Sequence, residues 1–110
     1  MPGLTVGNAT DEAARTGVTV VRFPGGWTAA VDVRGGGPGV RETAALSPEN
    51  GYAKLHALTL SGGSVFGLGA ADAVTAALSQ AGEGFLVRPE TPRVPIVAGA
   101  VLYDLANGGD

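Results

Sequence analysis

Apolar residues are clustered along the chain, and the spacing within each cluster predicts the element that it forms. Between residues 65 and 81 they recur every three or four positions, which is the period of a helix with one buried face. Directly before it, the nearly continuous apolar run from Leu55 to Leu60 predicts a buried strand, and Gly82 is suited to cap the helix C-terminus. A strand, a glycine loop at residues 61–64 and a helix are therefore expected in that order. The predicted helix face is built mainly of alanine and comprises Phe66, Ala70, Ala73, Val74, Ala77 and Leu78.

A β-hairpin is predicted nearer the N-terminus. The run from Val18 to Phe23 is rich in β-branched residues, and a second run from Thr28 to Val33 follows after the turn-forming residues 24–27. In the second run Val31 and Val33 alternate with mainly polar residues, which favours a strand with one buried face. The two runs are therefore interpreted as antiparallel arms.

Three further segments complete the predicted organisation. The glycine-rich stretch 35–39 predicts a loop, and Ser47 followed by Pro48 has the residue types of a helix N-cap and first helical position. The apolar segment from Val94 to Leu105 is ambiguous between strand and helix, and we interpret it mainly as a strand. Because the chain stops at residues 107–110, directly after a segment on which something should pack, we expect a truncated or processed product.

The composition indicates one small unit. A domain of 110 residues buries only about two-thirds of the surface that its unfolded chain exposes. The 19 glycines raise the entropy cost of folding, and three Phe, two Tyr and one Trp supply little bulky core volume. We therefore expect residues 1–110 to belong to a single domain whose stability depends on another chain.

Charge and residue types exclude several classes of function. A net charge of −3, from 7 Lys and Arg against 10 Asp and Glu, provides no basic patch for nucleic acid or an anionic membrane. The chain has no cysteine, and His56 is its single histidine, so neither a disulfide nor a transition-metal site is expected. The first eight residues lack the pattern of a secretory signal, and no apolar run approaches the roughly 20 residues that span a bilayer. A cytoplasmic protein is expected.

The Ser-Gly-Gly-Ser sequence at residues 61–64 is the best candidate for chemistry. Unpaired N–H groups at a helix N-terminus favour negative charge, so this loop could hold a phosphate, a carboxylate or an oxyanion. The same residues also suit a turn that caps a helix, and from the motif alone that structural interpretation is favoured. A nucleophile elbow would need glycine in place of Phe66, and a P-loop would need lysine at Leu68 and Ser or Thr at Gly69. Neither motif is present.

Other polar residues have structural interpretations. His56 lies inside the predicted apolar strand without an acidic residue in local register, which favours a packed or half-exposed histidine over a general base. Asp32 with Arg34 is predicted to form a surface ion pair that orders the glycine-rich loop, and so is Arg41 with Glu42. Surface pairs of this kind contribute under about 1 kcal/mol.

Five strings in the chain resemble, in sequence and order, those of the DmpA-type peptidases, the family of L-aminopeptidase/D-esterases, β-aminopeptidases and nylon-oligomer hydrolases. They cover nearly all of the chain, although Asn8 stands where the family usually has histidine. The strings are Pro2-Gly-Leu-Thr-Val-Gly-Asn-Ala9, Gly17-Val-Thr-Val-Val21, Ala30-Val-Asp-Val-Arg-Gly-Gly36 with Pro38-Gly-Val-Arg-Glu-Thr43, Leu60-Ser-Gly-Gly-Ser-Val-Phe-Gly-Leu68 with Ala70-Ala-Asp72, and Val94-Pro-Ile-Val97 with Ala100-Val-Leu-Tyr-Asp-Leu105.

The resemblance implies a four-layer αββα sandwich similar to the N-terminal-nucleophile hydrolases, of which residues 1–110 supply the N-terminal part. It implies an amide-bond hydrolase, an aminopeptidase or amidase, whose precursor cuts itself. The new N-terminal Ser or Thr of the downstream β-chain becomes the nucleophile, with its own α-amino group as base. The nucleophile is therefore outside this chain, and neither metal nor cofactor is implied. The implied partners are the β-chain, further αβ units in a homo-oligomer, a tetramer in the family, and a small peptide, amide or ester substrate with a free amino terminus.

By the same resemblance, only the glycine loop reaches the active-site region, and neither Ser61 nor Ser64 is the nucleophile. Some relatives have tyrosine at the position of Phe66, with its hydroxyl near the nucleophile. Phe66 cannot donate that hydrogen bond, so its implied role is to shape the pocket. The implied pocket-lining residues are Gly62, Gly63, Ser64, Phe66 and Gly67.

Two other functions stay open. The first is a non-enzymatic module that binds a small anionic ligand or a protein through residues 61–64, and it would fold and bind alone. The second is an enzyme remnant that ends at Asp110 and has lost its catalytic half, although the glycine content argues against its independent stability.

Overall fold

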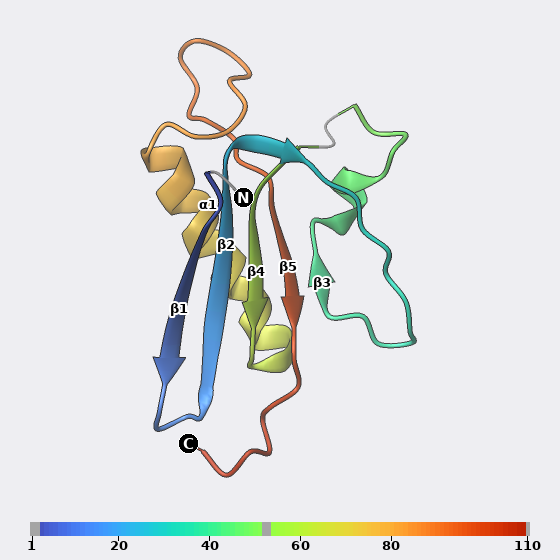
Figure 1. Ribbon diagram of the computed structural model, residues 1–110, viewed down its shortest axis with the longest axis vertical. Coiled ribbons are helices and arrows are strands. Elements are labelled where there is room, and N and C mark those ends of the chain that lie inside the picture. Colours follow the sequence, from blue (N-terminus) through green and yellow to red (C-terminus); the bar gives the residue numbers. More distant parts are fainter. Residues whose placement is uncertain (1–2, 52–53, 110) are drawn as a thin grey trace.

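The chain folds into a mixed β-sheet with a helix against one face (Figure 1). The computed structural model describes residues 3–51 and 54–109. Within them are β1 (Thr5–Asp11), β2 (Thr16–Thr28), β3 (Val40–Arg41), β4 (Lys54–Ser61), β5 (Val97–Val101), the 3₁₀ segments η1 (Thr43–Leu46) and η2 (Ser64–Gly69), and the helix α1 (Ala70–Gln80). These five strands have the order β1-β2-β4-β5-β3, with β4 and β5 parallel and the other neighbours antiparallel. The predicted α/β class is confirmed.

The N-terminal hairpin forms between other strands than those predicted. β1 pairs along its whole length with the first half of β2, and residues 12–15 make the turn. The predicted turn, residues 24–27, lies inside β2 instead, where the register against β4 shifts. Gly25 and Gly26 both have a φ of +77°, which lets the strand bend without ending.

The predicted second arm of the hairpin is wrong. Residues 29–39 form no strand, although 35–39 is a loop as predicted. Val31 is 46% exposed and Val33 is 40% exposed, because no neighbouring strand covers their face in the described part of the chain. β1 takes the place of this arm, and the hydrophobic pattern does not predict it because every one of its residues is exposed.

The predicted helix start at Ser47 is also wrong, since a 3₁₀ segment ends there. Ser47 is the C-cap of η1, with a φ of −61° and a ψ of 138°. This extended backbone is the conformation that a residue before proline prefers. Asn50 then turns the chain back by donating a side-chain N–H to the carbonyl of Ala44 at 2.6 Å.

The predicted buried strand is confirmed as β4, but the α-helix starts five residues later than predicted. Residues 64–69 are 3₁₀, which rotates about 120° per residue instead of 100°, so the buried face shifts. Ala71 and Leu78 are buried, whereas Ala73 and Ala77, placed on the buried face by the pattern, are exposed. Phe66 is 78% exposed, so its predicted place on that face is wrong as well.

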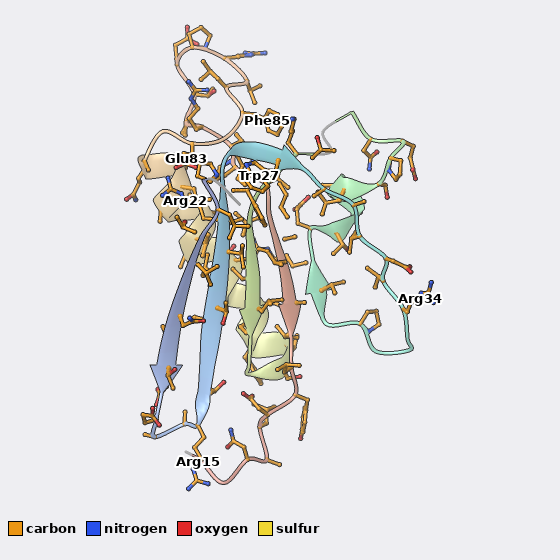
Figure 2. All side chains as sticks on the ribbon, viewed as in Figure 1. Arg15, Arg22, Trp27, Arg34, Glu83 and Phe85 are labelled. Atoms are coloured by element: carbon orange, nitrogen blue, oxygen red, sulfur yellow. The ribbon has the colours of Figure 1, made fainter. Side chains whose placement is uncertain are left out.

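The C-terminal end of α1 is tied to the sheet. Gly82 has a φ of +79°, and the N–H of Glu83 bonds the carbonyl of Leu78 at 2.9 Å, which makes the predicted glycine cap. The carboxylate of Glu83 forms an ion pair with Arg22 of β2. Figure 2 shows both residues at this end of the sheet, far from Arg15 in the hairpin turn.

β5 is shorter than the predicted strand from Val94 to Leu105. Pro95 has no N–H for a ladder, and the strand begins only at Val97. After Val101 the chain leaves the sheet, because Leu102 exchanges hydrogen bonds with the loop after β4. Asn107 lies close to the β1–β2 turn, where its side-chain amide donates to the carbonyls of Ala14 and Arg15.

Two hydrophobic clusters lie on opposite faces of the sheet. On one face α1 packs on β2, β4 and β5, in a cluster of Ala57, Ala71, Leu78 and Val97 with Val20 and Val74. On the other face η1 covers one end of the sheet, in a cluster of Leu46, Leu55 and Ala98 with Phe23, Ala29, Leu58 and Ile96. α1 and η1 therefore pack on opposite faces of the sheet, each through its own hydrophobic cluster.

The rest of the second face is open in the part of the chain that the structure describes. Asn8, Thr19, Leu60, Ala100 and Val40 are successive neighbours across the five strands of this face. Leu60 is 46% exposed although it lies in a central strand. This face therefore lacks a covering layer within residues 3–51 and 54–109.

Two features of the sequence fall outside the described residues. Pro2 opens the first of the resembling strings, and Asp110 is the last residue of the chain, where processing is considered. Among the described helices, none is long and apolar enough to cross a membrane.

Candidate functional site

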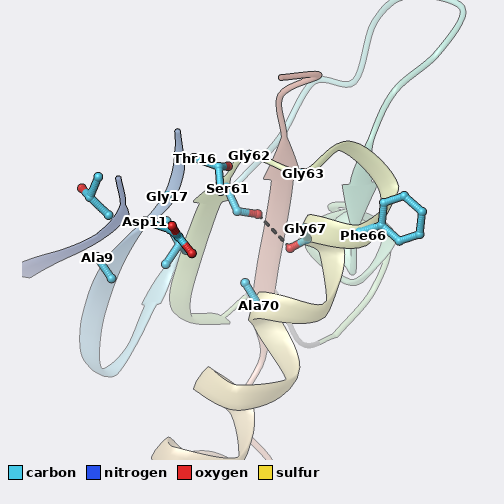
Figure 3. A pocket seen from close by; sticks show the side chains of 12 residues that line it. Ala9, Asp11, Thr16, Gly17, Ser61, Gly62, Gly63, Phe66, Gly67 and Ala70 are labelled. Carbon is cyan, nitrogen blue, oxygen red and sulfur yellow. Dashed lines mark hydrogen bonds between the residues drawn. The ribbon is translucent and has the colours of Figure 1, made fainter. Parts of the chain in front are cut away.

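A concavity of about 440 Å³ lies where the glycine loop, residues 61–64, faces the β1–β2 hairpin (Figure 3). One wall is the loop with η2 and the first residue of α1, and the other wall is the end of the hairpin. Four of the five predicted pocket residues line it, and substrate binding there stays a prediction. The lining residues are Ala9, Thr10, Asp11, Thr16, Gly17, Val18, Ser61, Gly62, Gly63, Phe66, Gly67 and Ala70.

Glycine is required in the loop because neighbouring atoms occupy the space of a side chain. A Cβ atom at Gly67 would lie 1.9 Å from the carbonyl oxygen of Gly62. A Cβ atom at Gly62 would lie 2.0 Å from Oδ2 of Asp104 and 2.1 Å from Oγ1 of Thr16. Gly63 has a φ of +86°, a backbone angle that residues other than glycine rarely adopt. The loop therefore has no room for a side chain at Gly62 or Gly67.

The backbone N–H groups of the loop are bonded within the protein. Gly62 donates to the carbonyl of Gly17 at 2.9 Å, and Ser64 donates to the carbonyl of Leu102 at 2.9 Å. Gly63 donates to Oδ1 of Asp104 at 2.6 Å. A carboxylate of the protein thus takes the position that a bound anion would need, which argues against the anion-binding module.

Asp104 is the residue of this region that the sequence pattern misses. Its Oδ2 accepts the Thr16 hydroxyl at 2.7 Å in addition to the Gly63 N–H. These two hydrogen bonds, the Thr16 bond first, lower the pKa of Asp104 from its ordinary value. One signal was available, because Asp104 is the only charged residue between Val94 and Leu105.

The two serines of the loop have structural contacts. Ser61 is 6% exposed and donates its hydroxyl to the carbonyl of Gly67 at 2.8 Å. Ser64 has a φ of +53° and lines a separate hollow beside Gly39 and Val101 instead of the concavity, and its role in a substrate pocket stays a prediction. These positions are consistent with the expectation that neither serine is a nucleophile.

His56 is buried away from the concavity, at 3% exposure. Its Nδ1 accepts the N–H of Ile96 at 3.0 Å, and its ring meets Phe85 edge-on with the centroids 5.4 Å apart. Burial lowers the pKa of His56 from the ordinary 6.5, because the charged form loses water. The packed histidine predicted from the sequence is confirmed.

We expect the lowered pKa of His56 to make stability fall in mild acid. The folded protein holds His56 neutral, so its contribution is complete above pH 6.5 and is lost as the pH falls from there towards the lower folded pKa. Denaturant unfolding of the complete protein at about pH 7.5 and 5.5 measures the loss. His56→Asn, which keeps a hydrogen-bond acceptor but does not titrate, should lose less stability over this range. An equal loss in both proteins would contradict the expectation.

One of the two predicted ion pairs forms. Asp32 and Arg34 pair at 2.6 Å on the surface, as predicted. Arg41 instead bonds Asp72 of α1 at 2.5 Å and the carbonyl of Leu68 at 3.3 Å, and its bond lowers the pKa of Asp72. The pairing expected with Glu42 is replaced because η2 and α1 bring these acceptors to β3. Among the described residues, no group of three or more His, Asp and Glu side chains could hold a metal ion.

Sequence comparison with known proteins shows the family of the chain. The pattern of peptidase family S58 matches residues 1–110. The chain belongs to this family. The resemblance to the DmpA-type peptidases is thereby confirmed, and the glycine loop of this S58 chain lies inside the matched region.

Several curated S58-like relatives are similar to the chain. An uncharacterized aminopeptidase of Mycobacterium tuberculosis is 50% identical over 93 residues, which are 84% of this chain and 26% of the relative. An uncharacterized aminopeptidase of Mycobacterium leprae is 48% identical over 92 residues, 84% of this chain and 25% of the relative. A 6-aminohexanoate-oligomer endohydrolase of Kocuria is 37% identical over 105 residues, 96% of this chain and 26% of the relative. The chain thus spans about a quarter of the length of these relatives.

The structure describes both positions that the resemblance singled out as differing from relatives. Asn8, in place of the usual histidine, accepts the hydroxyl of Thr19 at its Oδ1 at 2.7 Å, on the open face of the sheet. Phe66, at a position where the resemblance gives some relatives a tyrosine, lies at the rim of the concavity and brings no hydroxyl to it (Figure 3). Both side chains are exposed in the described structure.

Proposed function

We propose that the complete protein is an amide-bond hydrolase, an aminopeptidase or amidase, and that this chain supplies its scaffold and one pocket wall. The observation that carries the proposal is the S58 match across residues 1–110, which includes the glycine loop and its concavity. The names of the relatives, aminopeptidase and 6-aminohexanoate-oligomer endohydrolase, both describe cleavage of amide bonds. The proposed substrate is a small peptide, amide or ester with a free amino terminus.

The proposed nucleophile is the N-terminal Ser or Thr of a β-chain that the precursor releases by cutting itself. Its hydroxyl oxygen would attack the substrate carbonyl while its α-amino group takes the proton. The amine leaves with that proton, and water then hydrolyses the acyl-enzyme ester. The bonding of Ser61 within its own loop supports a nucleophile outside this chain.

The proposed fold of the complete protein is a four-layer αββα sandwich. In support of it, α1 covers one face of the sheet and the opposite face is open around Leu60. A sheet with one apolar face exposed needs a second layer to exclude water. Since the matched residues make up only 26% of the relatives' length, the proposed second sheet comes from the remaining sequence. A cytoplasmic homo-oligomer of αβ units belongs to the same proposal.

Denaturing intact-mass analysis of the protein from the complete gene, with N-terminal sequencing of each chain, tests the proposed function. We expect two chains whose masses sum to the precursor, the second beginning with Ser or Thr. Replacing that residue by alanine should leave one uncleaved and inactive chain. A single species with the mass of these 110 residues would contradict the proposal and leave a binding module or a remnant.

A further inference from the structure

Residues 102–109, which follow β5, pass along the glycine loop and the hairpin end. Leu102 donates its N–H to the carbonyl of Ser61 at 2.8 Å and accepts the N–H of Ser64 at 2.9 Å. Further on, Asn107 donates its side-chain amide to the carbonyl of Arg15 at 2.6 Å. One segment therefore contacts both walls of the concavity.

Asp104 connects these walls directly. Oδ1 accepts the N–H of Gly63 at 2.6 Å, and Oδ2 accepts the hydroxyl of Thr16 at 2.7 Å. Gly63 belongs to the loop wall and Thr16 to the hairpin wall, and both line the concavity. A single carboxylate thus spans two elements that are 47 residues apart in sequence, counted from Thr16 to Gly63.

The position of the carboxylate is tightly defined. The missing side chain of Gly62 leaves the space that Asp104 and Thr16 fill, since a Cβ atom there would lie about 2 Å from both oxygens. Hydrogen bonds to an ionised acceptor are about twice as strong as bonds between neutral groups. With one short bond to each wall, a shift of either wall would break a bond or leave a donor unpaired.

We propose that Asp104 is a positioning residue that, in addition to the backbone hydrogen bond from Gly62 to Gly17, holds Gly63 against the hairpin and thereby sets the shape of the concavity. The consequence for catalysis rests on the proposed function, because a pocket wall matters to turnover only if substrate binds there. The hydrogen bonds by which Asp104 holds the glycine loop do not depend on the proposed function. The two parts are therefore tested by separate measurements.

The experiment compares variants of the complete protein by hydrogen exchange of the amides in residues 61–69 and by hydrolysis of an amino-acid p-nitroanilide. In Asp104→Ala, both donors lose their partner. We expect exchange at residues 62–64 to become at least about tenfold faster. We also expect kcat to fall about 100-fold, with a smaller change in KM, because small misplacements near a reacting group have large effects on rate.

Three further variants separate positioning from other roles. Asp104→Asn can accept from Gly63 with its oxygen and donate to Thr16 with its amide, so exchange and kcat should stay within about tenfold of the wild type. Thr16→Val removes one of the two bonds and should lie between Asp104→Ala and the wild type. Asp32→Ala, which removes an equally small carboxylate from a surface pair, should change neither measurement.

The outcomes distinguish the proposals. Unchanged loop exchange in Asp104→Ala would overturn the positioning role, and so would an Asp104→Asn protein as damaged as Asp104→Ala, because charge would then matter instead of the two bonds. If Asp104→Ala does not accumulate as folded protein, Thr16→Val and Asp104→Asn carry the same comparison. Faster loop exchange in Asp104→Ala, together with no amide hydrolysis by the wild-type protein, would support the positioning role while the proposed function fails.

Discussion

Gly67→Ala should destabilise the complete protein by about 3 kcal/mol and lower kcat about 100-fold. The new Cβ atom would lie 1.9 Å from the carbonyl oxygen of Gly62 and 3.0 Å from Oγ of Ser61. Because the first contact is with backbone, rotation of a side chain cannot relieve it. η2 and the glycine loop must move apart, which also weakens the hydrogen bond from Ser61 to the carbonyl of Gly67.

Gly69→Ala is the matched control for this variant. Gly69 lies two residues further along, has a φ of −64°, and a Cβ atom there would meet nothing within 4 Å. Alanine at such a position reduces the entropy of the unfolded chain, so we expect unchanged stability or a gain of about 0.5 kcal/mol. Denaturant unfolding of both variants, with steady-state hydrolysis, measures the difference. Equal effects of the two substitutions would contradict the steric account of the glycine loop.

Leu60→Asp should prevent accumulation of folded, mature protein. Leu60 lies in the central strand β4, on the face that residues 3–51 and 54–109 leave open, and is 46% exposed there. If the remaining sequence covers this face, as the proposed sandwich requires, the substitution buries an unpaired charge at a cost of several kcal/mol. Soluble yield and the fraction of self-cleaved precursor are the measurements.

Val87→Asp is the control for the open face. Val87 is 69% exposed in the loop between α1 and β5, where a charge stays in water, and we expect wild-type yield and cleavage. Wild-type behaviour of Leu60→Asp as well would show that the face stays open in the complete protein. The sandwich would then be wrong, although the family membership of the chain would stand.

The candidate site was only partly predictable from the sequence. The position of the glycine loop followed from the local order of apolar run, Ser-Gly-Gly-Ser and helical period, and four of the five residues inferred from the resemblance line one concavity. Ser64 lines a separate hollow, and its N–H bonds Leu102, a residue 38 positions later in the chain that no local pattern connects with it. Asp104 was missed for the same reason, since its partner Thr16 is 88 residues away. Contacts between such distant residues leave no local pattern.

The sequence by itself determined the α/β class and the strand–loop–helix order around residues 61–64, because buried faces, glycines and caps act within a few residues of one another. The family followed from the resemblance of five strings in the right order. Only the tertiary structure decided which strand pairs with β2, where the α-helix begins and what fills the glycine loop. β1 is exposed along its length and becomes a strand because β2 offers it an edge, not because of its own hydrophobic pattern. Glycine is required at position 62 only because the fold brings the side chains of Asp104 and Thr16, from opposite ends of the chain, into the space beside it.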